Sequence, residues 1–186
     1  MPRISPLQQD DWDAELRAIL ERRPAPAHVA LGEHNIFSTL ARNKALFTAW
    51  MPFAGHLLSR GVLPGREREL LILRTGYNCG SDYEWGQHVR IGLAAGLSRA
   101  EIDRIAVGPS AAEWSPEDRA LLQAADELHR DAKISDATWA RLAASFDEQA
   151  LIEITVLVGQ YHLVAFALNS LEVELDEGLE GLPSEG

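Results

Sequence analysis

The sequence predicts an all-α protein. Apolar residues recur at helical spacing along most of the 186 residues, and no segment of six or more residues alternates as a half-buried strand does. Helix-start signals recur as well, because Ser81 and Ser98 are each followed three residues later by a glutamate (Glu84 and Glu101), the pattern of a capping box. We therefore expect a fold of about seven to eight helices joined by short connections.

The first segments are bounded mainly by prolines. Pro24 and Pro26 end the first helix, and Asn35 is a plausible cap of the second. Pro52 kinks or divides that second helix, since a proline inside a helix removes one backbone hydrogen bond and clashes with the preceding turn. The expected helices are residues 10–22, 36–50 and 53–59, with a connector at 25–35.

The later helices are bounded by caps and glycines. Serine or aspartate precedes most of them, and each can accept a hydrogen bond from the first helical turn. Gly96 ends the helix that begins at Ser81, and glycine is common at the end of a helix. The expected helices are residues 64–77, 81–96, 98–107 and 115–131, one that opens at Ser135, and a long apolar one over 147–174.

Composition limits the class of protein. The chain is 46% apolar and 24% charged, so an ordinary soluble core can form. Its one cysteine, Cys79, excludes an intramolecular disulfide and a Cys₄ or Cys₂His₂ zinc site. The most apolar stretch, residues 152–168, is interrupted by polar residues and predicts a buried helix. The first nine residues show no apolar signal-peptide core. We expect a soluble cytoplasmic protein with no membrane partner.

The acidic charge lies largely at one end. The formal net charge is −11, and residues 172–186 contain six acidic residues and no basic one. The basic residues elsewhere are scattered, whereas binding to phosphates requires clustered lysine or arginine. We therefore expect no nucleic-acid partner.

One candidate functional residue is a carboxylate on an apolar helix face. Glu69 lies at the centre of the apolar face of the helix expected over 64–77, and Arg68 is expected to point elsewhere. Such a carboxylate is costly unless it is paired or kept protonated. Glu69 is therefore either a functional group or a structural one that caps a helix end or pairs with an arginine such as Arg66 or Arg90.

The following helix carries Ser81, Glu84 and His88 on one face. Glu84 and His88 are four residues apart and can touch. A carboxylate beside an imidazole orients the ring and raises its basicity, which suits proton transfer near neutral pH. A surface ion pair or a satisfied core histidine would leave the same pattern. No metal is expected here, because a stable zinc or iron site needs about three protein ligands.

Three runs of this sequence resemble one known superfamily. They are residues 66–74 (RERELLILR), 83–89 (YEWGQHV) and 95–102 (AGLSRAEI). Together they resemble the carboxymuconolactone decarboxylase/alkylhydroperoxidase D superfamily, closely over about residues 63–107 and more loosely over most of 36–175. The resemblance implies an alkylhydroperoxidase D-like helical fold that assembles into homo-oligomers, trimers or hexamers, with pockets near subunit contacts.

The same resemblance divides the chain into three parts. Residues 1–35 are expected to form an N-terminal helix and connector arm, and residues 36–175 the carboxymuconolactone decarboxylase-like domain. Residues 176–186 are polar, acidic and glycine-containing, and we expect them to form a flexible tail.

The sequence departs from both chemistries that the superfamily is known for. The peroxidase branch carries a glutamate, a Cys-x-x-Cys pair and a histidine. Glu69 and His88 match the ends of that pattern, but Ser81 and Glu84 stand at the cysteine positions. Cys79 lies two residues before the first of them and does not replace it. The decarboxylase branch has a glutamate four residues before its histidine, as Glu84 precedes His88, but usually a serine where this chain has Glu69.

The resemblance and the residues together predict acid–base catalysis without a cofactor. The expected reaction is decarboxylation or isomerisation of a small carboxylated or lactone substrate. His88 would donate a proton to carbon, Glu84 would orient His88, and Glu69 would act as a second acid or hold the other ring nitrogen. The residues expected to bind substrate are Ser81, Tyr83, Trp85, Cys79 and Tyr161.

Two other functions remain open from the sequence. One is an alkylhydroperoxidase-like oxidoreductase, a peroxidase or antioxidant protein, that uses Cys79 or an external thiol. A cysteine near a helix N-terminus can have a lowered pKa, although a buried inert cysteine would also fit. The other is a non-catalytic oligomeric binding protein in which Glu69 and His88 form a structural pair.

Overall fold

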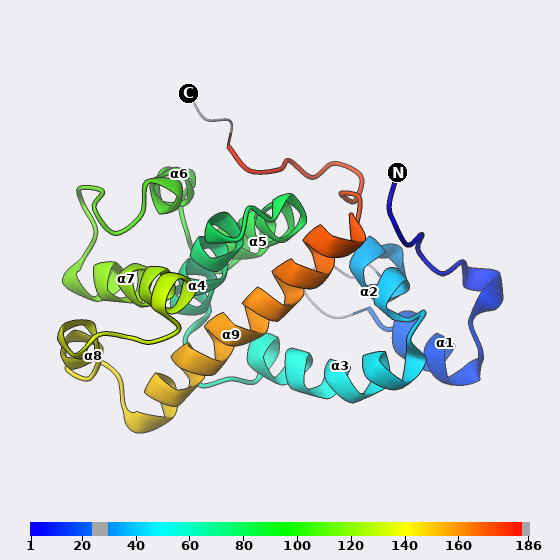
Figure 1. Ribbon diagram of the computed structural model, residues 1–186, viewed down its shortest axis with the longest axis horizontal. Helices are drawn as coiled ribbons and strands as arrows, with labels where there is room; N and C mark the ends of the chain where they lie inside the picture. The colour runs from blue at the N-terminus through cyan, green and yellow to red at the C-terminus, as the bar shows by residue number, and fades with distance from the viewer. Residues whose placement is uncertain (24–29, 184–186) are drawn as a thin grey trace.

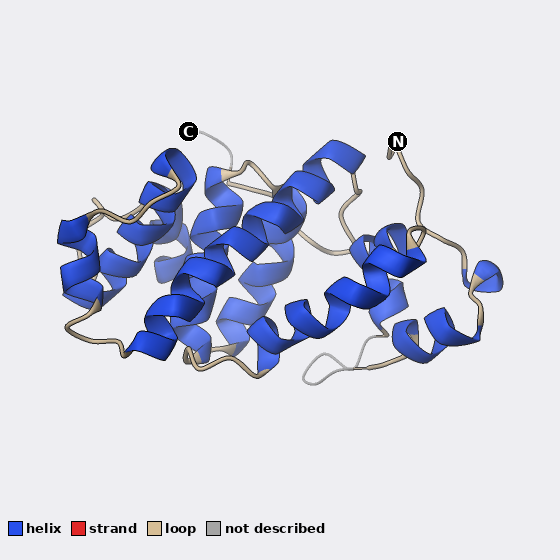
Figure 2. Ribbon diagram, turned by 60° about the horizontal axis from the view of Figure 1, so that its bottom comes forward, coloured by secondary structure: helices blue, strands red, loops and turns tan. Residues whose placement is uncertain are grey.

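The computed structural model describes residues 1–23 and 30–183, and this part of the chain forms helices and no strand (Figure 2). The all-α class is therefore confirmed. Two 3-10 helices, Gln9–Asp11 and Leu31–Glu33, accompany the α-helices. The α-helices are α1 (Ala14–Leu20), α2 (Asn35–Leu40), α3 (Lys44–Ser59), α4 (Gly65–Asn78), α5 (Asp82–Ala94), α6 (Arg99–Val107), α7 (Pro116–Asp131), α8 (Asp136–Leu142) and α9 (Glu148–Leu171).

Helix α4 forms the centre of the fold. It packs against α5, α6, α7 and α9, and its residues from Glu69 to Gly76 are all buried. A helix that is buried on every side takes apolar residues around its whole circumference, as Leu70 to Leu73 do here. Helix α9 crosses the same core (Figure 1), where its inner residues include Ile154, Leu157 and Val158. The two charged residues of this stretch, Glu69 and Arg74, therefore lie on the most buried helix described.

Helix α9 is also the one described helix that is long and apolar enough to cross a membrane by length and composition. Of its most apolar window, 56% is buried inside the fold. This burial is typical of the central helix of a helical domain, as the sequence predicted from its polar interruptions.

The N-terminal helices pack into a smaller cluster around Leu16, Leu20 and Phe47. The sequence prediction of a helix over 10–22 is correct only in part, because a 3-10 turn precedes α1 and Asp13 caps α1 by accepting from the Leu16 amide at 2.9 Å. Residues 25–29 of the expected connector at 25–35 lie outside the described residues; in the remainder, residues 31–33 form the second 3-10 helix and α2 begins at residue 35.

The expected helix over 36–50 is wrong in its boundaries. The helix is interrupted between α2 and α3. The side chain of Asn43 accepts a hydrogen bond from the Leu46 amide and caps the start of α3. Helix α3 then continues through Pro52. Phe47 and Leu57 on either side of the proline are both buried, and this packing outweighs the loss of one helical hydrogen bond.

The acidic C-terminal segment, which the sequence predicts to be flexible, is held at Asp176. Its carboxylate accepts from the Tyr83 hydroxyl at 2.8 Å and from the Asn35 amide at 2.9 Å, and its Oδ2 lies 2.8 Å from His34 Nδ1. Further along, Leu182 donates its amide to Asp82 at 2.9 Å. Although burial opposes it, hydrogen bonds from His34, Asn35 and Tyr83 lower the pKa of Asp176. Residues 184–186 lie outside the described part.

Candidate active site

A tight turn between α4 and α5 brings the candidate residues together. Cys79 ends α4, and Gly80 adopts a φ of +60°, which glycine tolerates best. Gly80 donates to the Tyr77 carbonyl at 3.0 Å and Ser81 donates to the Gly76 carbonyl at 2.9 Å, which is the Schellman arrangement. Helix α5 therefore folds back against α4.

Two glycines allow the helices to approach closely. A Cβ added to Gly76 would lie 3.4 Å from Cγ of Glu84, and one added to Gly92 would lie 3.0 Å from a methyl carbon of Leu97. Gly92 also lies beside Glu69, whose Cβ would be 3.7 Å away. The small residues that the sequence places on these helices thus make room for Glu69 and Glu84 between them.

Glu69 and His88 form a buried pair. The Nδ1 atom of His88 lies 2.6 Å from Oε2 of Glu69, and the Arg68 Nε–H donates to Oε1 of Glu69 at 2.9 Å. Glu69 is completely buried, while the imidazole of His88 keeps 9% of its surface exposed. Short bonds of this kind between charged or chargeable groups are among the stronger hydrogen bonds in proteins.

The arginine that pairs with Glu69 differs from the sequence expectation. Arg66 instead binds Asp118 and Glu101, each through a bond of 2.6–2.7 Å, and these two acids raise the pKa of the Arg66 guanidinium. Arg68, expected to point elsewhere, reaches the carboxylate of its own neighbour Glu69. Helical periodicity predicts the direction in which a side chain leaves the helix. A long arginine side chain can still bend along the helix surface and reach a buried carboxylate.

The hydrogen bond to Glu69 determines which nitrogen of His88 is available. A carboxylate can only accept, so the proton on this side of the ring belongs to Nδ1, and Nε2 faces away from the pair. The ring of Tyr161 from α9 meets the His88 ring edge-on, with centroids 5.0 Å apart and planes at 90°. Burial raises the pKa of Tyr161 well above its usual range, and the charges of Glu69 and Glu84 add to this effect.

Glu84 has a different environment from Glu69. Both of its carboxyl oxygens are buried and have no hydrogen-bond partner among the described residues, so the expected contact between Glu84 and His88 does not form. Burial raises the pKa of Glu84 well above its ordinary range, and the nearby charge of Glu69 raises it further. Burial therefore favours the protonated, neutral form of Glu84, which has a proton to donate.

Ser81 is the second group without a partner. It precedes α5 as its N-cap residue, but its side chain makes no capping hydrogen bond, and its buried hydroxyl has no partner among the described residues. The capping box expected from Ser81 and Glu84 is therefore absent, whereas the equivalent box of Ser98 and Glu101 is confirmed. Buried polar atoms almost always have partners, so two adjacent exceptions on one helix face indicate a site for ligand or water.

The other residues expected to bind substrate lie in three separate places. Tyr161 contacts His88 as described. Tyr83 points to the other side of α5, where its hydroxyl contacts Asp176, and Trp85 lies in the main core against Tyr77, with ring centroids 5.9 Å apart. Tyr83 and Trp85 are therefore held by structural contacts.

Cys79 belongs to a different cluster. It is half-buried, with its sulfur 3.9 Å from Nδ1 of His129 on α7. Burial raises the pKa of the Cys79 thiol to about 11, and the charge of Glu84 contributes. The pKa is thus raised by burial and not lowered as considered from the sequence, and Cys79 stands at the C-terminal end of α4 rather than at the start of a helix.

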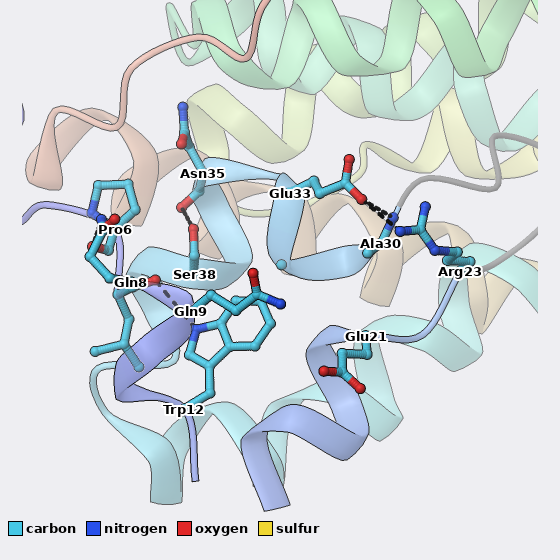
Figure 3. Close-up of a pocket in the computed structure, with 12 residues that line it drawn as sticks. Pro6, Gln8, Gln9, Trp12, Glu21, Arg23, Ala30, Glu33, Asn35 and Ser38 are labelled. Carbon is cyan, nitrogen blue, oxygen red and sulfur yellow. Dashed lines mark hydrogen bonds and ion pairs between the residues drawn. The ribbon is translucent and has the colours of Figure 1, made fainter. Parts of the chain in front are cut away.

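Two cavities lie away from the Glu69–His88 pair. One of about 740 Å³ lies among the N-terminal elements, where Trp12, Arg23 and Glu33 are among its lining residues (Figure 3). The other, of about 230 Å³, is lined by residues that include Trp114, Arg119 and Arg141. Neither is lined by Glu69, Glu84 or His88, so a ligand would meet this site first at the exposed part of the His88 imidazole.

Comparison with known proteins finds a family match over part of the chain. Residues 44–127 match the model of the carboxymuconolactone decarboxylase family, a segment that contains Glu69, Ser81, Glu84 and His88. Over that segment the chain is similar to the carboxymuconolactone decarboxylase family, and its fold is that of alkylhydroperoxidase D-like structures. The search of curated proteins found no match.

Several solved structures have the same fold. The debrominase Bmp8 is 15% identical with a TM-score of 0.78, over 94% of this chain and 92% of that one. A peroxidase-related protein from Ralstonia eutropha JMP134, described as an alkylhydroperoxidase AhpD core, is 21% identical with a TM-score of 0.69. The match covers 94% of this chain and 93% of that one. A protein of unknown function from Agrobacterium tumefaciens, provisionally assigned as the antioxidant defence protein AhpD, is 23% identical with a TM-score of 0.67. The match covers 78% of this chain and 96% of that one.

Proposed function

We propose that this chain is an acid–base enzyme that decarboxylates or isomerises a small carboxylated or lactone substrate without a cofactor. The observation that carries the proposal is the contrast between its two buried carboxyl groups. Glu69 is bound by Arg68 and His88, whereas both oxygens of Glu84 lack a partner. A carboxylate held by a histidine, beside a buried carboxyl group that has no partner, is an arrangement suited to acid–base catalysis.

In this proposal His88 and Glu69 keep roles that the sequence predicted, and only the role of Glu84 differs. Glu69 positions His88, because it holds the ring through Nδ1 at 2.6 Å. When His88 is protonated, its Nε2–H is the proton available to a substrate carbon. Glu84, protonated by burial, would donate a hydrogen bond to the oxygen on which charge develops. General acids and bases of this kind contribute roughly 10²–10⁴-fold each.

In a decarboxylation the steps balance with these groups alone. The bond between the substrate carbon and its carboxylate breaks, CO₂ leaves, and the electron pair passes into a conjugated enolate. Glu84 stabilises the enolate oxygen, and His88 Nε2 returns a proton to carbon. In an isomerisation His88 removes one proton and returns it at another carbon, again without a redox step.

The test is an assay of CO₂ release and double-bond migration with a panel of unsaturated lactone acids and enol acids. We expect turnover by the wild type, and losses of about 10²–10⁴-fold in His88→Gln and Glu84→Gln with unchanged helicity. His56→Gln and Glu148→Gln, which replace exposed residues outside the site, should retain wild-type activity. If no panel member reacts and His88→Gln only loosens the fold, the chain is a non-catalytic binding protein.

A second candidate is reduction of hydroperoxides by Cys79. Its support is the histidine 3.9 Å from the sulfur, together with the peroxidase-related and debrominase proteins of the same fold. An external thiol would reduce the oxidised cysteine, while the hydroperoxide is reduced to an alcohol and water. The raised pKa of the thiol opposes this function. Thiol-dependent hydroperoxide turnover that disappears in Cys79→Ser would establish it in place of the first proposal.

We also propose that the protein is a cytoplasmic homo-oligomer. The supporting observation is an apolar face of α9 left exposed in the single chain, formed by Ile152, Val156, Leu163 and Phe166. Apolar residues gathered along one helix in this way indicate a protein contact. Light scattering should give a multiple of the chain mass for the wild type and a smaller mass for Phe166→Glu. A monomeric wild type would contradict the proposal.

A further inference from the structure

A second cluster of chemically active side chains lies outside the Glu69–His88 pair. Cys79 at the end of α4, His129 in the last turn of α7 and His162 in α9 meet where these three helices come together. The sulfur of Cys79 lies 3.9 Å from Nδ1 of His129, and that nitrogen lies 2.9 Å from Nε2 of His162. All three potential ligand atoms lie within 4.8 Å of one another.

We propose that Cys79, His129 and His162 bind one Zn²⁺ ion, with a fourth position open to water. One thiolate and two imidazoles are ligands that zinc prefers over magnesium or calcium, which favour oxygen. This site is separate from the proposed acid–base function and does not depend on it.

Two of the three ligand separations are close to those of a tetrahedral zinc site, and the third is within 4.8 Å. Zinc–sulfur and zinc–nitrogen bonds of about 2.3 and 2.05 Å place sulfur and nitrogen about 3.6 Å apart and two nitrogens about 3.3 Å apart. The corresponding separations here are 3.9 and 2.9 Å. Each differs from the ideal by less than about 0.5 Å, which small side-chain rotations would supply.

The outer contacts already orient two of the ligands. His162 Nδ1 lies 2.8 Å from the Val158 carbonyl oxygen, so it carries the proton and leaves Nε2 with a lone pair toward His129. A second hydrogen bond of this kind is the usual support of a histidine that ligates zinc. Asn169 donates to the Cys79 carbonyl at 2.8 Å and holds the backbone of the cysteine in place.

The surroundings favour a cation and leave it accessible. Cys79 and His129 both stand at helix C-terminal ends, where the unpaired carbonyl groups create a negative partial charge. Without an ion, a proton lies between the facing nitrogens of His129 and His162, and zinc would displace it along with the thiol proton. His129 is exposed, so the ion has a route from solvent.

Zinc titration of the chelator-treated full-length protein tests the proposal. Calorimetry should give one tight site per chain in the wild type. Cys79→Ser, His129→Gln and His162→Gln should each weaken the affinity more than about 100-fold, since loss of even an outer-shell partner costs about 10–100-fold. His56→Gln, which removes an exposed histidine of α3 far from the cluster in sequence, should bind zinc as the wild type does.

Cobalt provides a readout that reports on the ligands directly. With Co²⁺ in place of zinc, a thiolate ligand in a tetrahedral site should give a sulfur-to-cobalt charge-transfer band that is lost in Cys79→Ser and kept in His56→Gln. Zinc should also raise the melting temperature of the wild type but not of His129→Gln. A wild type without the band, or zinc affinity equal in all four variants, would overturn the proposal.

Discussion

The buried bond between Glu69 and His88 leads to a quantitative prediction about stability. Glu69 is fully buried, and it holds His88 Nδ1 at 2.6 Å and Arg68 Nε at 2.9 Å. A hydrogen bond to a charged partner contributes about 1.5–3 kcal/mol to the free energy of unfolding. Glu69→Gln keeps the shape of the side chain but offers His88 and Arg68 a neutral amide, so we expect it to lose an amount in this range.

A double-mutant cycle isolates the pairwise part of this effect. The free energy of unfolding would be measured in urea for the wild type, Glu69→Gln, His88→Gln and the double variant, at one protein concentration and pH. We expect a coupling energy of at least about 1.5 kcal/mol, because each single variant leaves the other partner buried and unsatisfied.

The chain offers a matched control for this cycle. Arg17 and Glu21 of the α1 region form an i,i+4 ion pair of 3.1 Å with both side chains largely exposed. Such pairs contribute only about 0.2–0.5 kcal/mol. The same cycle with Arg17→Gln and Glu21→Gln should therefore give a much smaller coupling. Equal coupling energies for the two pairs would refute the reasoning, since burial would then make no difference to the Glu69–His88 bond.

Three further outcomes follow from the other polar groups. The free energy of unfolding of the wild type, measured in urea, should fall relative to that of Glu84→Gln as pH rises above about 4.3. The folded state keeps a proton on Glu84 that the unfolded chain releases. Urea midpoints of the two proteins that change in parallel with pH would contradict this. Iodoacetamide should alkylate Cys79 slowly at neutral pH and faster toward its pKa of about 11, and a neutral-pH rate equal to that of the unfolded chain would be inconsistent with this value. Asp176→Ala should speed cleavage of the C-terminal segment by a glutamyl-specific protease, because it removes the partner of Tyr83 and Asn35; unchanged cleavage would show that Asp176 does not hold the segment.

The helical class and several helix boundaries could be predicted from local signals. The capping box of Ser98 and Glu101 forms as expected, and Asp147 caps α9. The same local rule failed at Ser81 and Glu84, because the Glu84 side chain lies against Gly76 of α4 and the buried Ser81 hydroxyl makes no capping bond. Pro52 did not end α3, because core packing on both sides outweighed a single lost hydrogen bond.

The sequence named candidate site residues but did not give their contacts. Helical phase placed Glu84 and His88 on one face of a helix and Glu69 on the apolar face of the preceding helix, and all three are buried in the structure. The expected pair of Glu84 with His88 rested on a separation of four residues on one helix. The observed pair joins His88 to Glu69 from the neighbouring helix, and a contact between helices depends on their packing angle and separation, which no short stretch of sequence encodes.

The sequence by itself determined what is local: the helices, most of their caps, the apolar faces and the polar residues that interrupt them. These features depend on residues within one or two turns of each other. Only the tertiary structure decided which carboxylate holds His88, which one is left without a partner, and that Cys79 meets His129 and His162 from two other helices. Side chains that are 19, 50 or 33 residues apart in sequence are joined there. Their proximity follows from the packing of α4, α5, α7 and α9 as a whole, because burial of the apolar faces fixes how these helices lie against one another.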